Sequence, residues 1–215
     1  MKWADRSQQI HMKYFRLFFT LPFRLVKVVF YKIRFRSFGW RSVIRSPLHL
    51  VGCPNIIVGN RVSIGYKTWL QALPLTGAEE CRLELRDRVL LGHFNHIIST
   101  RRIILEESVL TADKVYISDN LHGFENIDIP IRDQPVMQHR EVVIGAGSWL
   151  GEHACILGAC IGRHCVIGAN SVVTHDIPDY CVAVGAPARI IKRYNPVTKN
   201  WERTAPDGSF LQKSV

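Results

Sequence analysis

Long apolar runs are missing from this sequence. No stretch of about 18 uncharged apolar residues occurs, which is the minimum that would suggest a membrane-spanning helix. The longest candidate, Leu17 to Phe23, is much shorter and contains Pro22. A transmembrane helix is therefore not expected.

Cysteine is sparse as well. The six cysteines are scattered along the chain and form no Cys-x-x-Cys pair. This pattern excludes a disulfide scaffold and argues against a zinc ribbon or a thioredoxin-type redox site. We interpret most of the cysteines as small buried apolar residues. Reduced thiols suit the cytoplasm, which is where we expect the protein.

Acidic residues are almost absent from the first fifth of the chain. The sequence has 28 Lys and Arg against 18 Asp and Glu, a net charge of +10. Residues 1–46 hold 11 of the cations and one acid, Asp5, and the remainder is balanced at 17 residues of each sign. A neutral body does not suit nucleic-acid binding, so no nucleic-acid partner is expected.

Residues 1–48 form a basic, aromatic segment in which we expect an amphipathic helix. Five of its cations lie on one ladder of three- and four-residue steps, which is a single helical stripe. They are Lys13, Arg16, Arg24, Lys27 and Arg34. A cationic stripe beside a wide aromatic face is typical of a helix on an anionic bilayer, so residues 10–38 predict peripheral membrane contact, on the inner face of the membrane. Packing on the body or on a neighbouring subunit is the alternative, and a cleaved signal peptide is a weaker one.

The body of the chain is a repeat with a period of six. An aliphatic residue leads each unit, often followed by glycine, with a small or branched residue four places later. The leaders include Val58, Ile64, Leu85, Leu91, Ile97, Leu105, Ile117, Ile144, Leu150, Ile156, Ile161 and Ile167. Three such units make one triangular coil of about 18 residues, and coils stack at the strand spacing of about 4.8 Å. The period predicts an all-β parallel β-helix of four to five coils within residues 49–194. A looped-out segment interrupts it at about 118–142, and residues 195–215 form a tail.

Three runs carry a family resemblance: Ile144 to Gly151 (IGAGSWLG), Ile167 to Pro178 (IGANSVVTHDIP) and Val184 to Lys192 (VGAPARIIK). Together with the repeats they resemble the hexapeptide-repeat acyltransferases, and most closely the galactoside, maltose and surface-polysaccharide O-acetyltransferases. The resemblance covers residues 50–194 and implies a left-handed β-helix that uses acetyl-CoA. It also implies a homotrimer with sites between subunits and a sugar hydroxyl as acceptor.

The resemblance points to His122 as the catalytic residue. The stretch from Ala112 to His122 lines up, without a gap, with the segment that carries the general base in galactoside acetyltransferases. An imidazole can remove the proton of a sugar hydroxyl as that hydroxyl attacks a thioester. Polysaccharide relatives often carry Asp-His-x-His-Gly here, and Asn120 replaces the first of those histidines. No Cys–His or Ser–His pair is evident, so direct transfer in a ternary complex is expected.

Four further residues are candidates for binding the acceptor. His93 and Asn95 lie where galactoside relatives carry an asparagine that contacts the acceptor sugar. Asp119 either orients His122 or caps the turn. Asn120 is the fourth candidate, and its role stays open. Ordinary surface positions on a coil are the alternative interpretation for His93 and Asn95.

The resemblance also implies that coenzyme A lies along the C-terminal coils. The positions carried over for it are Trp149, Glu152, Ala169, Thr174, His175, Arg189, Lys192 and, as a neighbour, Arg193. The last three are cations suited to phosphate groups. Relatives often have lysine at the position of His175. A solvated end of the β-helix would also explain these cations.

Other functions remain open at this stage. The same base chemistry would support N-acetylation of an amino sugar. A non-catalytic membrane-associated scaffold is a second alternative. A zinc enzyme with the same fold needs two histidines five residues apart, and the nine histidines contain no such pair, so no metal is expected. The basic segment favours a lipid-linked or surface-polysaccharide precursor as the acceptor.

Overall fold

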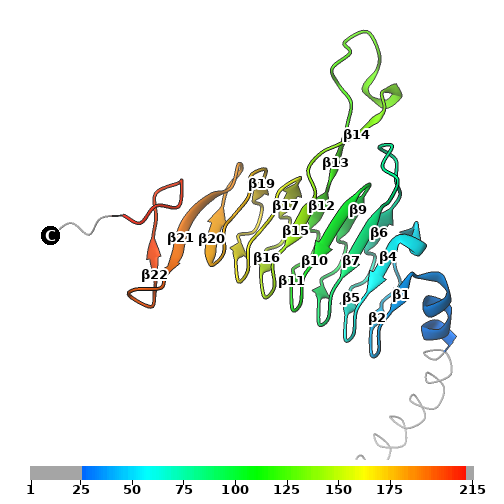
Figure 1. Ribbon diagram of the computed structural model, residues 1–215, viewed down its shortest axis with the longest axis horizontal. Coiled ribbons are helices and arrows are strands. Elements are labelled where there is room, and N and C mark those ends of the chain that lie inside the picture. Colours follow the sequence, from blue (N-terminus) through cyan, green and yellow to red (C-terminus); the bar gives the residue numbers. More distant parts are fainter. Residues whose placement is uncertain (1–25, 212–215) are drawn as a thin grey trace, which may run out of the picture.

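The computed structural model describes residues 26–211. Short strands wind into a left-handed parallel β-helix, a triangular prism with three sheets as its walls (Figure 1). A helix over 26–34 lies at one end, and an antiparallel hairpin ends the other. Within the described part of the chain, no helix is long and apolar enough to cross a membrane.

Each wall takes one strand from successive coils. The first sheet orders β1 (Ser37–Phe38), β4 (Ile56–Val58), β7 (Arg82–Leu85), β10 (Arg102–Leu105) and β15 (Val142–Ile144). The second orders β2 (Val43–Ile44), β5 (Ser63–Ile64), β8 (Leu90–Leu91), β11 (Leu110–Thr111), β16 (Trp149–Leu150), β18 (Val166–Ile167), β20 (Cys181–Val184), β21 (Arg189–Asn195) and β22 (Asn200–Arg203). The third orders β3 (His49–Val51), β6 (Trp69–Ala72), β9 (His96–Ser99), β12 (Tyr116–Ser118), β17 (Cys155–Leu157) and β19 (Val172–Val173). A short 3-10 turn, η1 (Cys53–Asn55), follows β3.

Buried side chains repeat in register from coil to coil. In the first sheet Val58 pairs with Leu85, Leu85 with Leu105, and Leu105 with Ile144. All four are at most 1% exposed. They are leaders of the six-residue units, so the predicted β-helix is confirmed, with its core along the prism axis. Shortening one of these side chains to alanine would cost about 2–5 kcal/mol of stability.

The β-helix is longer than the sequence suggested. Strands β1, β2 and β3 form a coil that begins at Ser37, inside the segment 1–48 that we expected to precede the repeat. At the other end, single bridges from Ile144 to Ile161 and from Ile161 to Ile177 continue the first wall. The expected four to five coils were too few. The six-residue pattern did not reveal the first coil, because its leader Phe38 lies among aromatic and basic residues that also match an amphipathic helix.

The N-terminal helix closes the first coil. Tyr31, Phe35 and Phe38 are each less than 10% exposed. The ring of Tyr31 lies 5.8 Å from that of Phe35 and 5.4 Å from that of Phe38, centroid to centroid. Their burial covers the open end of the prism with apolar area. For these aromatic residues the alternative interpretation, packing on the body, is the right one.

The other side of the same helix is uncovered. Four large apolar side chains are exposed there: Val26 (67%), Val29 (55%), Phe30 (49%) and Ile33 (81%). Of the predicted cationic stripe, Lys27 and Arg34 lie on this helix. Lys13, Arg16 and Arg24 lie outside the described residues, as does Pro22.

The chain turns back on itself after β20. Strand β21 runs antiparallel to β20, and β22 runs antiparallel to β21. A bridge between Thr204 and Phe210 extends this hairpin. The expected boundary between β-helix and tail, at 194 and 195, therefore runs through β21, and β22 in the described part of the tail extends the second sheet at its edge.

Insertions gather on the edge where the third sheet passes into the first. We call this edge the arm corner; its turns are residues 52–55, 73–81, 100–101, 119–141, 158–160 and 174–176. The longest is an arm made of β13 (Asn120–His122) and β14 (Val136–Gln138), antiparallel to each other, with η2 (Ile131–Asp133) between them. The arm stands away from the prism (Figure 1). It occupies the interruption at 118–142.

Candidate functional site

Asp119 anchors the arm at its root. Its carboxylate is fully buried and accepts hydrogen bonds from the backbone N–H groups of residues 100–102 at 2.8–2.9 Å. The hydroxyls of Ser99 and Thr100 and the amide of Asn120 donate to it at 3.0–3.2 Å. These donors occupy the carboxylate's acceptor positions. The structure therefore selects the turn-capping role for Asp119 and does not support its predicted contact with substrate.

His122 lies at the end of β13, where the arm leaves the prism. It is exposed and pairs with Val136 on β14. Gly123 donates its N–H to the carbonyl of Pro135 at 2.9 Å, which continues the hairpin beyond the histidine. Within residues 26–211, no hydrogen bond reaches the imidazole. An accessible imidazole at this place stays a candidate for the predicted general base.

The direction of the His122 side chain follows from the hairpin register. Asn120 pairs with Gln138 across the arm, and alternate residues along a strand share a face, so His122 projects on the same face as both. The Gln138 Oε1 accepts a hydrogen bond from the Thr76 hydroxyl at 2.7 Å, and it lies 3.2 Å from the oxygen of the Thr100 hydroxyl, which donates to Asp119. This face of the arm is therefore turned toward the coils that precede it.

Asn120 contributes to the same foundation. Its amide donates to the carbonyl of Ile98 at 3.2 Å as well as to Asp119. Its backbone N–H donates a hydrogen bond to the Ser118 hydroxyl oxygen at 3.2 Å. The residue that replaces the first histidine of the family pattern thus ties the arm to the previous coil.

His93 and Asn95 lie at a different edge. Both are in the turn between the second and third sheets. Asn95 is fully buried, donates to the carbonyl of Ala112 at 3.2 Å and accepts the N–H of Val115 at 2.9 Å. The His93 Nδ1 accepts the N–H of Tyr66 at 2.8 Å. Within one chain these contacts serve the stacking of the coils, and the predicted acceptor contacts of His93 and Asn95 stay predictions.

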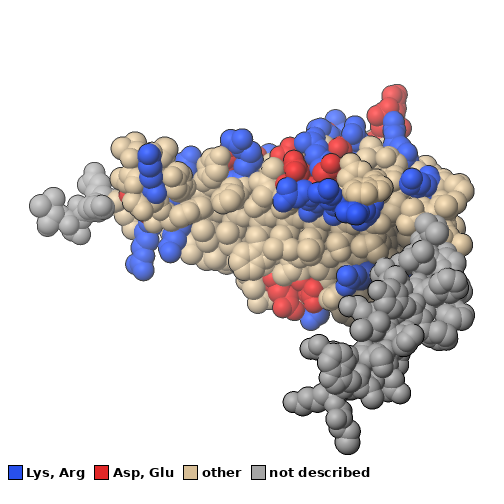
Figure 2. All heavy atoms as spheres, turned by 90° about the horizontal axis from the view of Figure 1, so that it is seen from below, with Lys and Arg blue, Asp and Glu red and all other residues tan. Residues whose placement is uncertain are grey.

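The candidate coenzyme residues fall largely on the second sheet. Trp149 is 46% exposed on its outer face, in register with Val166, then Val182, then Lys192. Strand β22 places Arg203 opposite Lys192. Seen from the side opposite the arm, an uncharged strip runs along the coils, with Lys and Arg at its C-terminal end and mixed clusters of Lys, Arg, Asp and Glu beside its N-terminal half (Figure 2). A long ligand with an apolar body and a phosphorylated end matches this distribution.

Three more of these residues border that column. Arg189 pairs with Val184 on the outer face of β20. Glu152 and Ala169 are exposed turn residues where the second sheet passes into the third, and the Lys114 Nζ lies 3.5 Å from a carboxylate oxygen of Glu152. Trp149, Glu152, Ala169, Arg189 and Lys192 therefore share one side of the prism.

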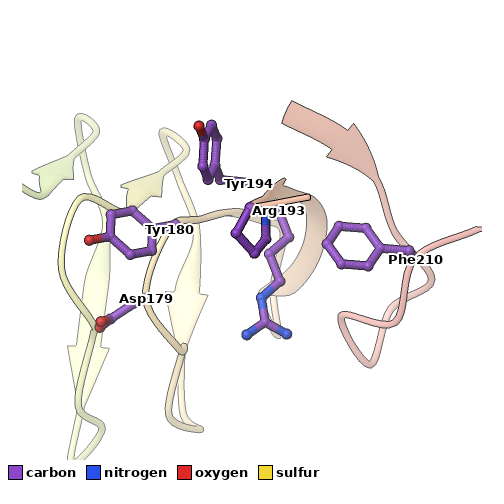
Figure 3. A pocket seen from close by; sticks show the side chains of 6 residues that line it. Asp179, Tyr180, Arg193, Tyr194 and Phe210 are labelled. Atoms are coloured by element: carbon purple, nitrogen blue, oxygen red, sulfur yellow. The ribbon is translucent and has the colours of Figure 1, made fainter. Parts of the chain in front are cut away.

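The side chains of the other three predicted coenzyme residues lie outside this column, although Arg193 is also on β21. Thr174 and His175 are at the arm corner, where the threonine hydroxyl is 3.0 Å from the histidine Nδ1. Arg193 lines a cavity of about 740 Å³ at the C-terminal end of the prism. Figure 3 shows its side chain between Tyr180 and Phe210. The sequence order of these cations did not reveal that Arg193 points away from Lys192.

Within one chain, the two groups of residues that make up the predicted site lie on opposite sides of the prism. In a triangular prism the arm corner lies opposite the wall formed by the second sheet. His122 is on that corner, whereas Trp149 and Lys192 are on that wall. A single chain therefore does not bring the base and the coenzyme column together.

The cysteines are poor nucleophiles in this fold. Cys165 is buried at a coil corner, and burial raises the pKa of its thiol to about 11. Burial likewise raises the pKa of Cys81 to about 11. All six thiols are free, and four are buried, as expected for small core residues. In the described part of the chain, no group of three or more His, Cys, Asp or Glu could hold a metal ion.

The structure adds residues that the sequence analysis missed. Arg203 lies outside the repeats, and only the β21–β22 hairpin places it beside Lys192. Thr76 and Gln138 are 62 positions apart, and their hydrogen bond depends on the arm folding back to the prism. No periodic signal marked either case.

Comparison with known proteins agrees with the repeat pattern. Residues 141–175 match the family model "Bacterial transferase hexapeptide (six repeats)". The chain is 39% identical over 159 residues to "Probable acetyltransferase Rv3034c" of Mycobacterium tuberculosis, covering 74% of this chain and 50% of the relative. It is 42% identical over 125 residues to "Putative lipopolysaccharide biosynthesis O-acetyl transferase WbbJ" of Escherichia coli, covering 54% and 63%. The chain thus spans between half and two thirds of the length of these relatives.

Solved structures show the same fold. A variant of AntD, an N-acyltransferase from Bacillus cereus in complex with dTDP and coenzyme A, superposes with a TM-score of 0.63 at 19% identity, covering 78% of this chain and 88% of that one. The acetyltransferase VCA0836 from Vibrio cholerae, complexed with acetyl coenzyme A, gives 0.53 at 20% identity, covering 80% and 78%. The chain is thus similar in its repeats to the bacterial hexapeptide transferases and has the fold of these solved structures.

Proposed function

We propose that the protein is an acetyl-CoA-dependent O-acetyltransferase that acylates a hydroxyl of a sugar, in a surface-polysaccharide or lipid-linked saccharide precursor. The observation that carries this proposal is the placement of His122. Its imidazole is exposed on a hydrogen-bonded arm, beside a prism whose opposite wall suits a long phosphorylated ligand. The relatives named for O-acetyl transfer support the choice of a hydroxyl acceptor.

The proposed reaction is a direct transfer. An imidazole nitrogen of His122 takes the proton of the acceptor hydroxyl while the oxygen attacks the thioester carbonyl. The tetrahedral intermediate then expels the thiolate of coenzyme A, and the imidazolium returns the proton to that sulfur. The products are the O-acetyl sugar and coenzyme A. The raised thiol pKa values of Cys81 and Cys165 agree with a route that has no acyl-enzyme.

Coenzyme A would lie along the outer face of the second sheet. Trp149 supplies apolar contact area there, and Lys192 and Arg203 supply charge for the phosphates at the C-terminal end. Arg189 stands next to them. Thr174 and His175 would reach the coenzyme from the arm corner of a second copy.

The proposed assembly is a homotrimer, which this arrangement supports. Because the base and the coenzyme column occupy opposite sides of one prism, a complete site needs the arm corner of one copy against the second sheet of the next. Cyclic association of three prisms satisfies this for every copy. Exposed apolar residues on the second sheet, among them Leu90 and Leu110, provide area for the contact.

The N-terminal helix is proposed to touch an anionic membrane surface. Val29, Phe30 and Ile33 expose apolar side chains, and Lys27 and Arg34 on the same helix supply cations. This combination favours the interface of a bilayer with anionic lipids. It would bring the enzyme to a lipid-linked acceptor on the inner face of the membrane.

The first experiment measures release of the coenzyme thiol from acetyl-CoA with a panel of free and lipid-linked sugars, for wild type, His122→Ala and His164→Ala. His164 is an exposed histidine at the corner between the first and second sheets and serves as the control. Loss of a general base lowers kcat by roughly 10²-fold or more, and we expect this for His122→Ala alone.

Three outcomes would contradict parts of the proposal. Equal activity of His122→Ala and His164→Ala removes His122 from the chemistry. Turnover with amino sugars only, giving amides, replaces O-acetylation by N-acetylation. Failure of the wild-type protein to bind acetyl-CoA favours a membrane-associated scaffold without catalytic function.

A further inference from the structure

A groove separates the N-terminal helix from the first coil of the β-helix. Its volume is about 670 Å³, and one wall is the side of the helix that carries Lys27, Val28 and Tyr31. The other wall is strand β2 with its flanking turns, residues 41–46. Figure 1 shows the helix at this end of the prism, beside β1 and β2. We call this space the helix groove; the proposed acetyl transfer uses none of its residues.

The helix groove is cationic. Of the described residues that line it, Lys27, Arg41 and Arg45 are basic and none is acidic. The sequence from residue 6 to residue 78 contains no Asp or Glu, so no neighbouring turn supplies a carboxylate. Among residues 26–211, none of the three cations takes part in an ion pair. Three cations without a partner around one groove favour an anionic ligand.

Two of the lining residues add directed hydrogen-bond donors. The Arg41 guanidinium lies over the ring of Trp40, 4.2 Å from its centroid, and in the described part of the chain no hydrogen bond occupies its N–H groups. Strand β2 is at the end of the second sheet, and the N–H groups of Val43 and Arg45 donate to the next coil at 2.9 and 3.0 Å. The N–H of Ile44, which lies between them, points the other way, toward the open edge of the sheet. Guanidinium and backbone donors in one groove suit the oxygens of a phosphate group.

An apolar stripe lies on the outer side of the same helix. Val26, Val29, Phe30 and Ile33 are three and four residues apart, which places their exposed side chains on one face, away from the buried Tyr31. A helix is about 10 Å across, and a helix in the interface of a bilayer inserts its apolar face by about 5–10 Å. With the stripe at that depth, the helix groove comes to the level of the lipid headgroups.

We propose that the helix groove binds the phosphate of an anionic glycerophospholipid, with the apolar stripe against the acyl chains. The inference rests on the membrane contact proposed above and adds the group that is recognised and the residues that recognise it. Arg41 and Arg45 belong to the β-helix, so the folded body takes part in binding as well as the helix. A bilayer is the source that satisfies both parts, because a free phosphate would leave the stripe exposed to water.

The test measures co-sedimentation of the full-length protein with vesicles. One set is phosphatidylcholine alone, and the other is phosphatidylcholine mixed with phosphatidylglycerol. The double variant Arg41→Gln, Arg45→Gln is expected to bind the anionic vesicles at least tenfold more weakly and the neutral vesicles as wild type does. The matched control is Arg61→Gln, Lys67→Gln, which removes the same charge from exposed positions on the next coil, outside the groove, and should change binding less than threefold. The Kd for acetyl-CoA should be the same in all three proteins.

A second arm separates a lipid from a free anion. The full-length protein is titrated with dihexanoyl phosphatidylglycerol below its micelle concentration and with inorganic phosphate, and binding is followed by NMR. We expect the short-chain lipid to bind and inorganic phosphate to bind at least tenfold more weakly. Equal binding of the two would make the helix groove a phosphate site and overturn the lipid as its occupant.

The remaining outcomes distinguish the groove from the proposals on which it rests. Equal losses in the two double variants would show that diffuse positive charge attracts the vesicles, and the groove is then wrong. If Ile33→Ser weakens vesicle binding and Arg41→Gln, Arg45→Gln does not, the membrane contact stands without the groove. Wild type that binds neither set of vesicles overturns both. The acetyl transfer is judged separately, by acetyl-CoA binding and by thiol release with free sugars.

Discussion

Two edges of the prism use the same repeat in opposite ways. At the edge between the second and third sheets, one residue in each of five successive turns adopts the left-handed conformation with φ between 55° and 58°, whatever its type. These residues are Lys67, Phe94, Lys114, His153 and Asn170. At the arm corner successive turns differ in length, and one becomes the arm. A regular edge offers a straight, repeated surface for a long ligand, whereas an interrupted edge can place a single side chain such as His122.

The largest expected effect distinguishes the two edges by comparing two aspartates whose carboxylates accept hydrogen bonds from turn N–H groups. Asp119→Ala leaves the buried N–H groups of residues 100–102 without their acceptor, and the expected loss of stability is about 3 kcal/mol or more. Asp113→Ala, at the regular edge, removes one acceptor, which the His93 N–H contacts at 2.6 Å, and should cost about 1 kcal/mol. Urea denaturation of both variants measures the difference. Equal losses would show that the arm root is no more dependent on its polar network than an ordinary turn.

The second test asks whether the column on the second sheet binds phosphate groups. Lys192→Ala and Arg203→Ala should each weaken acetyl-CoA binding about tenfold, which corresponds to about 1.4 kcal/mol. The effect should diminish at high salt because the contacts are ionic. Arg193→Ala, in the adjacent strand position but facing the end cavity, should change the Kd less than threefold. Isothermal titration calorimetry gives these values, and a larger effect for Arg193 than for Lys192 would move the phosphates into the end cavity.

The smallest expected effect concerns the edge between the first and second sheets. The backbone N–H of Arg163 and its guanidinium hold the pKa of Asp179 below its usual value, and the N–H of Asn60 does the same for Asp87. A lowered pKa in the folded state means that these carboxylates stabilise the fold when ionised. The stabilisation is complete when the pH is above about 4, which is the pKa of an aspartate in the unfolded chain. It is lost as the pH falls through the lower pKa of the folded state.

We therefore expect Tm to be level from pH 7 to pH 5 and to fall below pH 4. Asp179→Asn should lower Tm slightly at pH 7 and flatten the acid limb, as followed by circular dichroism. An unchanged acid limb in that variant would remove Asp179 from the groups responsible.

The hexad period by itself predicted most of the fold. A leader such as Leu85 or Ile144 must stack on its equivalents, because no other arrangement of short strands buries an apolar residue every six positions. The length of the β-helix was less predictable. Phe38 leads a hexad but lies among aromatic residues that also match an amphipathic helix, and only packing against Tyr31 and Phe35 shows which interpretation holds.

The candidate site likewise has a part that the sequence predicted and a part that required the tertiary structure. The sequence alone determined the repeat and the family resemblance, and it predicted His122 as the candidate base, because each of these depends on residues close together in the chain. Tertiary structure decided that Asp119 is a buried anchor, that Asn95 supports a coil turn and that Arg193 faces away from Lys192. It also joined Thr76 to Gln138 at the arm corner. These facts depend on which coil stacks on which and on how the arm folds back, and pairings between residues far apart in the chain leave no periodic trace in the sequence.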